Sequence, residues 1–404
     1  ARAALEREGG DARTEAYLLM ALGSIEVRDG KSDAALPFFE KALPLRLQVY
    51  GPDHPDVAAV HNNIGVALTS LGRPLDGVPH LEKSLAIYER ALGPEHPETG
   101  NALINLGVIA DDLAQLDKSL EYYHRALAGA EKGLGPDHPN VAAALDNIAI
   151  TLANQGKYEE AIAGYRRAIS ILEAAFGPDG AELTTVLGNL GLALIETGDW
   201  NGALETLQRA RVIAEKSFAS DHPDMSTVWL NLAEAELGLG RTVDARAHFE
   251  LALEVSRKSM APDHPDLALA YVGLGSWHLH QKHYREALVQ LEKARDIQDK
   301  SLGADHPHTT GTLTRIGEAL LGLHQSEQAI PELERAVVLG QKHAAMPGAL
   351  EGARFMLARA LWEDRKDRAR AVELATQARD GYARRGKKKE LSKVQDWLTR
   401  PTRR

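Results

Sequence analysis

One short segment recurs along this chain at a fixed interval. It reads Gly51-Pro52-Asp53-His54-Pro55 at its first full occurrence, and an acidic residue followed by His-Pro returns at multiples of 42 residues. The acidic members are Asp53, Glu95, Asp137, Asp221, Asp263 and Asp305. Asp179-Gly180-Ala181 keeps the register without the His-Pro. A constant period of this length indicates an array of stacked supersecondary units and not a set of independent globular domains.

The residues between two such segments have the periodicity of two helices. In the fourth repeat, Val141 and Ile148 fall on one apolar stripe and Ile162 and Ile169 fall on another, with a polar turn at Gly156 between them. Each repeat is therefore expected to be a pair of antiparallel helices. Neither helix can bury its stripe alone, so neighbouring pairs must stack.

The recurring segment punctuates these helices. We expect Gly51 to close one helix in a left-handed conformation, Pro52 to prevent its continuation and Asp53 to cap the next helix. Pro55 then occupies the first turn, and Asp56, three residues after the expected cap, complements the helix dipole. The same roles are expected in the other copies.

Small residues recur inside the pairs at positions where two helices should touch. The first helix carries a glycine that is expected to face the second helix of its own pair, at Gly65, Gly107, Gly191, Gly275 and Gly317. Alanines follow twelve positions later, at Ala161, Ala203, Ala245, Ala287 and Ala329, and again seven further on, at Ala126, Ala168, Ala210, Ala252, Ala294 and Ala336. A large side chain at such a contact should overpack and cost about 1–3 kcal/mol.

The array extends beyond the acidic-His-Pro segments. Asp11 lies 42 residues before Asp53, and Pro347–Glu363 with Arg368–Arg384 forms a further pair. We therefore predict nine helix pairs over residues 1–386, followed by a capping helix and basic tail over 387–404, in which a lone helix runs from about Lys387 to Leu398. The expected units are 11–50, 53–92, 95–134, 137–176, 179–218, 221–260, 263–302, 305–343 and 347–385.

The pattern resembles the tetratricopeptide repeat, in which a Leu/Ile-Gly pair is followed by alanines at these two spacings. The 42-residue period and the Asp-His-Pro start are similar to the long repeats of kinesin light chains. This resemblance covers nearly the whole chain. It implies an all-α fold, a right-handed α-solenoid of about nine stacked helix pairs with a C-terminal capping helix, and a role in protein–protein interaction.

The amino-acid composition excludes several kinds of site and partner. There is no cysteine, which excludes disulfides and thiolate metal sites and is compatible with a cytoplasmic location. No apolar run approaches the roughly 20 residues of a membrane span, so direct membrane insertion is not expected. The net charge is −10 although residues 379–404 are basic, and this acidic body argues against nucleic acid as the partner. The basic end is interpreted as a solvated terminal helix.

The strongest functional candidate is a ladder of asparagines. Asn63, Asn105, Asn147, Asn189 and Asn231 each stand two residues before the glycine position in five successive repeats. In tetratricopeptide arrays the first helices line the concave surface, and there an Asn amide can both donate to and accept from the backbone of an extended peptide. The alternative is that these amides bond within or between helices of the array. Both interpretations stay open from sequence.

Other groove positions describe the expected partner. These positions include Asn62, Val66, Thr69, Asn101, Ile104, Val108, Asp112, Asp146, Ile150, Asn154, Leu192, Glu196, Leu230 and Glu234. The mixture is apolar and mildly acidic, and favours a partner segment with apolar anchors and some basic character. Lysine and arginine that would clamp a terminal carboxylate are not found among these positions.

Metal and catalytic sites find no support in the pattern. The histidines of the recurring segment occur once per repeat, and neighbouring pairs stack near 10 Å apart, whereas zinc needs ligands about 2 Å from one ion. His278, His280 and His283 lie closer together but have no evident carboxylate or thiolate partner. Phosphate-binding, nucleophile-elbow and kinase motifs are absent from the sequence, so neither a cofactor nor enzymatic activity is expected of this chain.

Two further hypotheses concern the parent protein and its assembly. The segments Ala358–Trp362 and Ala371–Ala375 resemble the end of repeat regions attached to bacterial, myxobacterial-like serine/threonine protein kinases. This resemblance implies that the array is the regulatory or substrate-recruiting arm of such a kinase. The opening Ala1 suggests a fragment or processed form, and an exposed first helix could then drive self-association.

Overall fold

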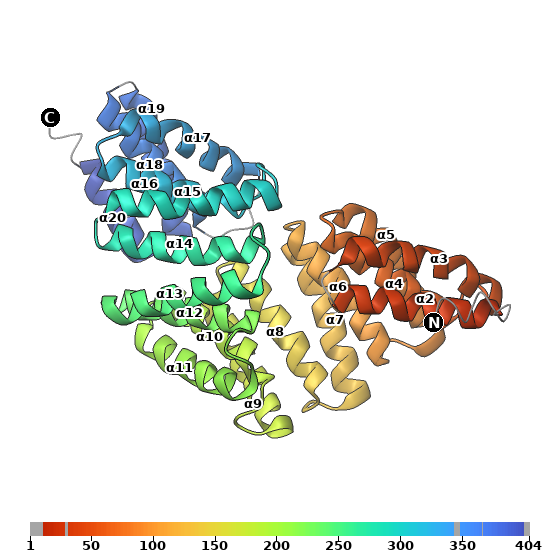
Figure 1. Ribbon diagram of the computed structural model, residues 1–404. Helices are drawn as coiled ribbons and strands as arrows, with labels where there is room; N and C mark the ends of the chain where they lie inside the picture. The colour runs from red at the N-terminus through yellow and green to blue at the C-terminus, as the bar shows by residue number, and fades with distance from the viewer. Residues whose placement is uncertain (1–10, 29–30, 343–347, 366, 400–404) are drawn as a thin grey trace. The chain divides into compact units, whose positions relative to one another are not determined.

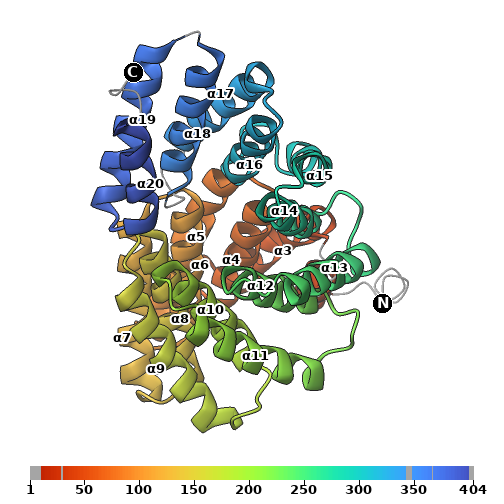
Figure 2. The same ribbon diagram turned by 90° about the vertical axis from the view of Figure 1, so that its left-hand side faces the viewer.

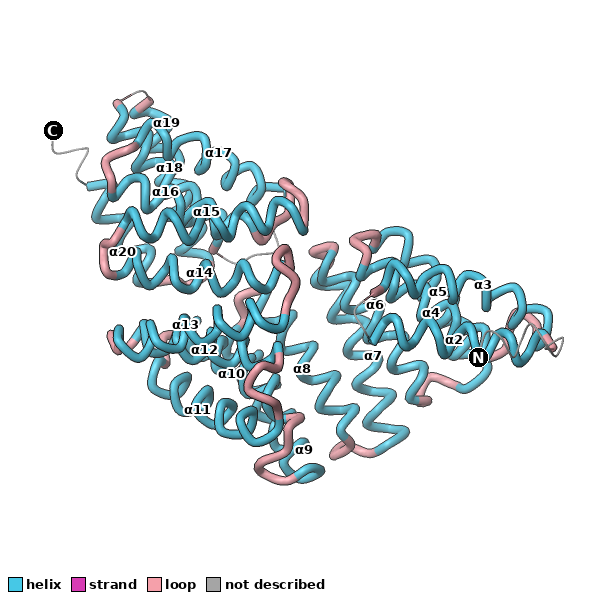
Figure 3. The backbone as a smooth tube through the Cα atoms, viewed as in Figure 1, coloured by secondary structure: helices cyan, strands magenta, loops and turns pink. Residues whose placement is uncertain are grey.

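The fold consists of helices joined by short links. The computed structural model describes residues 11–28, 31–342, 348–365 and 367–399. Within these ranges it contains nineteen helices and no strand (Figure 3). Consecutive helices pack against one another in pairs, which confirms the all-α tetratricopeptide solenoid expected from the repeat.

The chain divides into two compact units, and each is described by itself. Unit 1 comprises residues 1–151 and 163–178, and unit 2 comprises residues 152–162 and 179–404. Unit 1 contains α2 to α7 and most of α8 and α9 (Figure 1). The bounds of these helices are α2 (Ala12–Arg28), α3 (Ser32–Tyr50), α4 (Pro55–Ser70), α5 (Pro74–Leu92), α6 (Pro97–Asp112), α7 (Leu116–Leu134), α8 (Pro139–Asn154) and α9 (Tyr158–Phe176).

Unit 2 continues the same alternation. Its later helices α16 to α19 lie side by side (Figure 2), with α17 packed on α16 and α18. The bounds are α10 (Leu183–Thr197), α11 (Trp200–Ser217), α12 (Pro223–Gly238), α13 (Thr242–Ser259), α14 (Pro265–His280), α15 (Tyr284–Ser301), α16 (Thr309–Gly322), α17 (Ser326–Lys342), α18 (Ala349–Asp364), α19 (Arg368–Arg384) and α20 (Lys388–Thr399).

Where a first helix carries the recurring glycine, this glycine faces a large side chain of the partner helix, as predicted. A Cβ added at Gly65 would lie 2.6 Å from Cγ of Leu81, and one at Gly107 would lie 2.3 Å from Cε1 of Tyr123. The large residue always follows sixteen positions after the glycine. The other pairs are Gly23 with Phe39, Gly191 with Leu207, Gly275 with Leu291 and Gly317 with Leu333. Absence of a side chain at this position lets the two backbones of a pair approach closely.

In the pairs that begin with α4 to α16, the turn between the two helices is fixed by a Schellman motif. At the end of α4 the N–H of Arg73 donates to the Leu68 carbonyl at 2.9 Å, and that of Gly72 donates to Thr69 at 2.9 Å. The residue equivalent to Gly72 has a φ between 57° and 86° from α4 to α16. Four of these positions are glycines. The other three are Ala114, Lys282 and His324, which adopt the left-handed conformation at some cost in backbone strain because they carry a Cβ.

The link between pairs differs from the prediction at its cap. His54 is the N-cap of α4, and its Nδ1 accepts a hydrogen bond from the backbone N–H of Asp56 at 3.1 Å. Corresponding bonds to the histidine of the segment occur at His96, His138, His222, His264 and His306. The helix begins one residue later than expected, so the imidazole nitrogen plays the acceptor role assigned to Asp53 and Asp56 is not the third residue after the cap.

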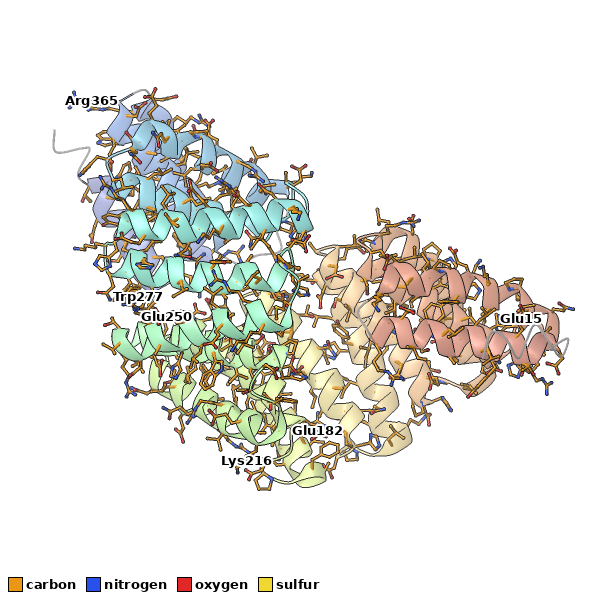
Figure 4. All side chains as sticks on the ribbon, in the orientation of Figure 1. Glu15, Glu182, Lys216, Glu250, Trp277 and Arg365 are labelled. Atoms are coloured by element: carbon orange, nitrogen blue, oxygen red, sulfur yellow. The ribbon has the colours of Figure 1, made fainter. Side chains whose placement is uncertain are left out.

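The displaced aspartate has a different partner. Asp53 forms an ion pair with Arg90 at 2.8 Å, at the end of the second helix of the same pair. The same spacing of 37 residues recurs in Glu95–Lys132, Asp179–Lys216, Asp263–Lys300 and Asp305–Lys342. Lys216 is among the side chains labelled in Figure 4. The aspartate therefore fixes the start of a pair to its end, while the histidine caps the helix.

The glycine that ends the second helix of a pair also differs from the prediction in its backbone conformation. Gly51 has a positive φ of 80°, as expected, but its ψ of 169° places it outside the left-handed helical region. Gly93 and Gly135 adopt the same combination. Only glycine enters this region at low cost, which explains its recurrence at the end of the second helices.

The last helix of unit 2 covers the end of its core. Val394 of α20 is fully buried, and Leu391, Trp397 and Leu398 pack against the same cluster. The Trp397 ring meets that of Trp362 edge-on at 5.8 Å. A solenoid exposes an apolar face at its last repeat, and α20 covers that face. The rest of the basic tail, and the residues before Asp11, lie outside the described residues.

Candidate functional site

The asparagine ladder lies on first helices in both units. In unit 1, Asn63 is on α4, Asn105 on α6 and Asn147 on α8, and in unit 2 Asn189 is on α10 and Asn231 on α12. All five side chains are partly exposed. Five successive pairs thus each present one amide at the surface of their unit.

Part of the ladder bonds within the array. The Nδ2 of Asn105 donates to Oδ1 of Asn62 at 2.9 Å, which joins α6 to α4. The Nδ2 of Asn147 donates to the carbonyl of Ala143 in its own helix, also at 2.9 Å. An amide offers two N–H groups and an acceptor oxygen, so each of these side chains keeps hydrogen-bonding capacity. The side chain of Asn63 makes no hydrogen bond with the described residues.

A surface depression in unit 1 lies between the third and fourth pairs. It has a cavity volume of about 20 Å³ between α6, α7 and α8, and its lining includes Asn101, Ile104 and Asn140. Asn101 was predicted as a groove residue from its repeat position. The depression therefore contains one predicted amide but none of the ladder residues.

Unit 2 has a depression at the equivalent place, two repeats later. It has a cavity volume of about 220 Å³ between α10, α11 and α12, and both ladder residues of the unit, Asn189 and Asn231, line it. Six lining positions of the first depression match it at a spacing of 84 residues: Gly100 with Thr184, Asn101 with Thr185, Ile104 with Gly188, Ala126 with Ala210, Asn140 with Asp224 and Ala144 with Val228. The replacement of Ile104 by Gly188 removes a branched side chain and leaves more space.

The lining of the unit 2 depression combines polar and apolar side chains. A Cβ added at Gly188 would lie 3.4 Å from Nδ2 of Asn231, so the glycine gives the amide room beside α10. Thr184 is 7% exposed, and its Oγ1 is buried without a hydrogen-bond partner among the described residues. A buried hydroxyl without a partner is costly, and a bound polar group would satisfy it.

The other predicted residues occupy varied environments. Asp112 is exposed at the last position of α6, and Asn154 is the last residue of α8 and belongs to unit 2. Asp146 is partly exposed on α8, where it acts together with burial to raise the pKa of Tyr165. These residues do not line either depression.

A half-buried carboxyl group, that of Asp111 beside the predicted Asp112, was not identified from the sequence. Asp111 accepts a hydrogen bond from Thr151 Oγ1 at 2.8 Å and one from the Tyr123 hydroxyl at 3.3 Å. Burial raises the pKa of the Asp111 carboxyl, although the hydrogen bonds from Thr151, Ser119 and Tyr123 act in the opposite direction. The network joins α6 to α7 and α8 within unit 1. Its sequence signal is only the spacing of four residues from Gly107.

The charged face of unit 2 includes Glu234 on α12. The Glu234 side chain is exposed, yet desolvation by the surrounding helices raises the pKa of its carboxyl, Arg315 on α16 acts to lower that pKa and Glu196 on α10 acts to raise it. Both glutamates were predicted as groove positions. Arg315 occupies the ladder position of the eighth pair and bonds through one guanidinium nitrogen to the carbonyl of Gly311 at 3.2 Å.

The histidines are explained by capping and packing. His54 stacks on Tyr50 at a ring distance of 4.5 Å, and His222 stacks on Phe218 at 4.7 Å. Trp277, labelled in Figure 4, lies edge-on to His278 at 5.0 Å. Over the described ranges, no cluster of three or more potential ligand side chains is arranged to hold a metal ion. In the same ranges, no helix has the length and apolar character to cross a bilayer.

Comparison with known protein families shows to which family the chain belongs. A tetratricopeptide repeat model matches residues 14–76, 56–131, 112–174, 141–216, 181–258 and 224–300. The chain belongs to the tetratricopeptide repeat family. Its helix pairs, glycine contacts and 42-residue period are therefore the family's fold in a long-repeat form. No curated protein matches the sequence.

Solved structures share this fold at low sequence identity. The apo form of the quorum sensor NprR from B. thuringiensis is 17% identical, with a TM-score of 0.60 over 80% of this chain and 87% of that chain. Apo RapI is also 17% identical, with a TM-score of 0.57 over 71% of this chain and 98% of that chain. Kinesin light chain repeats from Podosopora anserina are 20% identical, with a TM-score of 0.44 over 52% and 99%.

Proposed function

We propose that this tetratricopeptide protein is a non-catalytic scaffold that binds an extended segment of a partner protein along the first helices of its pairs. The observation that carries the proposal is the unit 2 depression, which is lined by Asn189, Asn231 and Thr184, whose buried hydroxyl has no hydrogen-bond partner in the part of the chain that the structure describes. Two amides in successive pairs can bond to the backbone of one segment without reading its sequence.

The surrounding charge defines the partner further. Glu196 and Glu234 lie on the same two first helices as the ladder amides, and Asp224 lines the depression itself. These carboxylates favour a basic residue on the bound segment, while Val228 and Leu207 provide apolar contact. A segment with apolar anchors and some basic character therefore matches this face.

The test begins with the intact 404-residue chain and a displayed library of random peptides. A selected peptide is then titrated against wild type and against the Asn189→Ala/Asn231→Ala double variant. Each lost hydrogen bond is worth about 1 kcal/mol, so the double variant should bind about tenfold or more weakly. Asn201→Ala on α11 is the matched control, since this exposed amide lies outside the depression.

The outcome is decisive when the fold is intact. Circular dichroism should show the same helical content for all three proteins. Affinity that is unchanged in the double variant would refute the assignment of the binding face. An equal loss in Asn201→Ala would point to a nonspecific effect of removing surface amides.

The kinase hypothesis is a separate proposal. It makes the array the regulatory or substrate-recruiting arm of a larger bacterial serine/threonine protein kinase, on the resemblance of Ala358–Trp362 and Ala371–Ala375. The first segment lies in α18 and the second in α19. The gene sequence upstream of Ala1 tests it, because a parent protein without a kinase domain would refute it.

A further inference from the structure

Lys387 occupies a rigid position between the last two helices of unit 2. Gly386 has a φ of 66° and closes α19, with its N–H donating to Ala383 at 3.2 Å. The N–H of Lys387 donates to the Tyr382 carbonyl at 3.0 Å, which completes a Schellman motif. This geometry sets the direction in which the lysine side chain leaves the backbone.

The side chain ends in a site built by the opposite end of unit 2. Its ammonium forms an ion pair with the Glu196 carboxylate and donates to the Glu196 carbonyl at 3.2 Å. The same ammonium lies 4.6 Å from the centre of the Tyr158 ring. The Lys387 side chain is only 17% exposed. Lysine ammonium groups normally remain hydrated, so this enclosure needs compensating partners.

Each of the three partners suits a primary ammonium. The Glu196 carbonyl is in the last turn of α10, where carbonyls lack intrahelical donors and the helix dipole favours a cation. The carboxylate supplies charge, and the aromatic face supplies a cation–π contact. Burial, with Glu196 beside it, raises the pKa of the Tyr158 phenol, so the ring stays neutral.

The contact joins residues 191 positions apart in the chain. Glu196 belongs to the first complete pair of unit 2, and Lys387 follows its last pair. Neighbouring pairs are held by their apolar cores, but this contact spans the intervening pairs. The ion pair therefore holds the two ends of unit 2 at a fixed separation. One of its partners, Glu196, is on α10, which also carries Asn189.

We propose that Tyr158 and Glu196 form a binding site for a lysine side chain, that Lys387 occupies this site in cis and holds unit 2 closed, and that a lysine of the partner segment displaces it. The partner part rests on the proposed function, whereas the site itself does not. Displacement exchanges one ammonium for another, so the charge of the site is the same in the closed and the bound states.

The site can be tested with n-butylammonium, which mimics the lysine side chain. Saturation-transfer difference NMR on the full chain compares wild type with Lys387→Met, in which the ammonium is replaced by a neutral side chain of similar length. We expect a signal at least threefold stronger in Lys387→Met, and its loss when Glu196→Gln is added. The matched control Lys389→Met, a neighbouring exposed lysine, should behave like wild type.

Two results would overturn the site. One is an equal butylammonium signal in wild type and Lys387→Met, and the other is a signal that survives Glu196→Gln. Spermidine is titrated in parallel, since binding at least tenfold tighter than butylammonium would reassign the site to free polyamines. Butylammonium has no peptide backbone, so these results do not depend on whether Asn189 and Asn231 bind a partner.

The closing role has its own readout. Hydrogen exchange of the last turn of α10 should be at least threefold faster in Lys387→Met than in wild type, because the Glu196 carbonyl and carboxylate lose their partner. Lys389→Met should leave exchange unchanged. Unchanged exchange in Lys387→Met, with normal circular dichroism, would refute the latch.

Discussion

A buried histidine pair in unit 1 gives the most quantitative prediction. His61 on α4 is 7% exposed, and its Nδ1 lies 2.9 Å from Nδ1 of His80 on α5. The same position of other repeats holds Leu103, Leu145 and Leu187. Histidine therefore replaces the leucine typical of a core position, and its imidazole must stay neutral to remain there.

The magnitude follows from the folded-state pKa. Burial, followed by the charges of His80 and Lys83, lowers the pKa of His61 from 6.5 to about 4. One pKa unit corresponds to about 1.4 kcal/mol, so the full effect is about 3 kcal/mol. Above pH 6.5 the histidine is neutral in both states and costs nothing. As pH falls below 6.5 the unfolded state takes up the proton first, and folding loses about 2 kcal/mol by pH 5.

The variant His61→Leu restores the residue typical of the repeat and removes this proton uptake. The assay is hydrogen exchange of α4 in the full chain at pH 7.5 and pH 5, because an array of repeats can open locally without global unfolding. Wild type should lose about 2 kcal/mol more local stability than His61→Leu over this range. His124→Gln on α7, an exposed histidine, should follow wild type.

The comparison at equal pH removes the intrinsic pH dependence of exchange and the contribution of the capping histidines, which both proteins share. The reasoning would be refuted if wild type and His61→Leu lost the same stability. A larger loss in the variant would mean that the histidine pair stabilises α4 in acid, with a sign opposite to that of a lowered pKa.

Two further predictions address the helix links and pairs. His54→Ala should lower the free energy of unfolding, measured by chemical denaturation, by about 1 kcal/mol because the helix loses its cap. Asp53→Ala should lower it by less because the Asp53–Arg90 ion pair is exposed. A larger loss in Asp53→Ala than in His54→Ala would show that Asp53 is the cap. Gly107→Ala should lower the free energy of unfolding by about 1–3 kcal/mol because the added methyl group clashes with Tyr123. Gly100→Ala is the control on the same helix: its added methyl group meets no described atom within 4 Å, so it should raise the free energy of unfolding by about 0.5–1 kcal/mol. Equal effects of the two variants would disprove the close approach of α6 and α7.

The local architecture could be derived from the sequence because the same residue types recur at the same positions of successive repeats. Gly65 and Gly107 mark the close contact inside each pair, and the polar turn with Gly156 marks its end. The cap was assigned to the wrong neighbour, since Asp53 and His54 are adjacent and aspartate is the commoner cap. The helix starts one residue later, at Pro55, and that shift makes the histidine the acceptor.

The ladder was visible at its fixed position, but its surroundings were not. Asn105 and Asn189 stand at the same place in the repeat, yet Asn105 bonds to Asn62 while Asn189 lines a depression. The difference comes from neighbours such as Ile104 and Gly188, whose side chains set the space between two pairs. A sequence shows the residue at each position, but not the volume left between two helices.

The sequence by itself determined the helix pairs, their close contacts and the family, because these depend on interactions within one or two repeats. Only the tertiary structure decided that His61 meets His80, that the buried Thr184 hydroxyl has no partner among the described residues and that Lys387 reaches Glu196. The last contact joins residues 191 positions apart. It depends on small rotations accumulated over every pair between α10 and α19, and no single repeat encodes that sum.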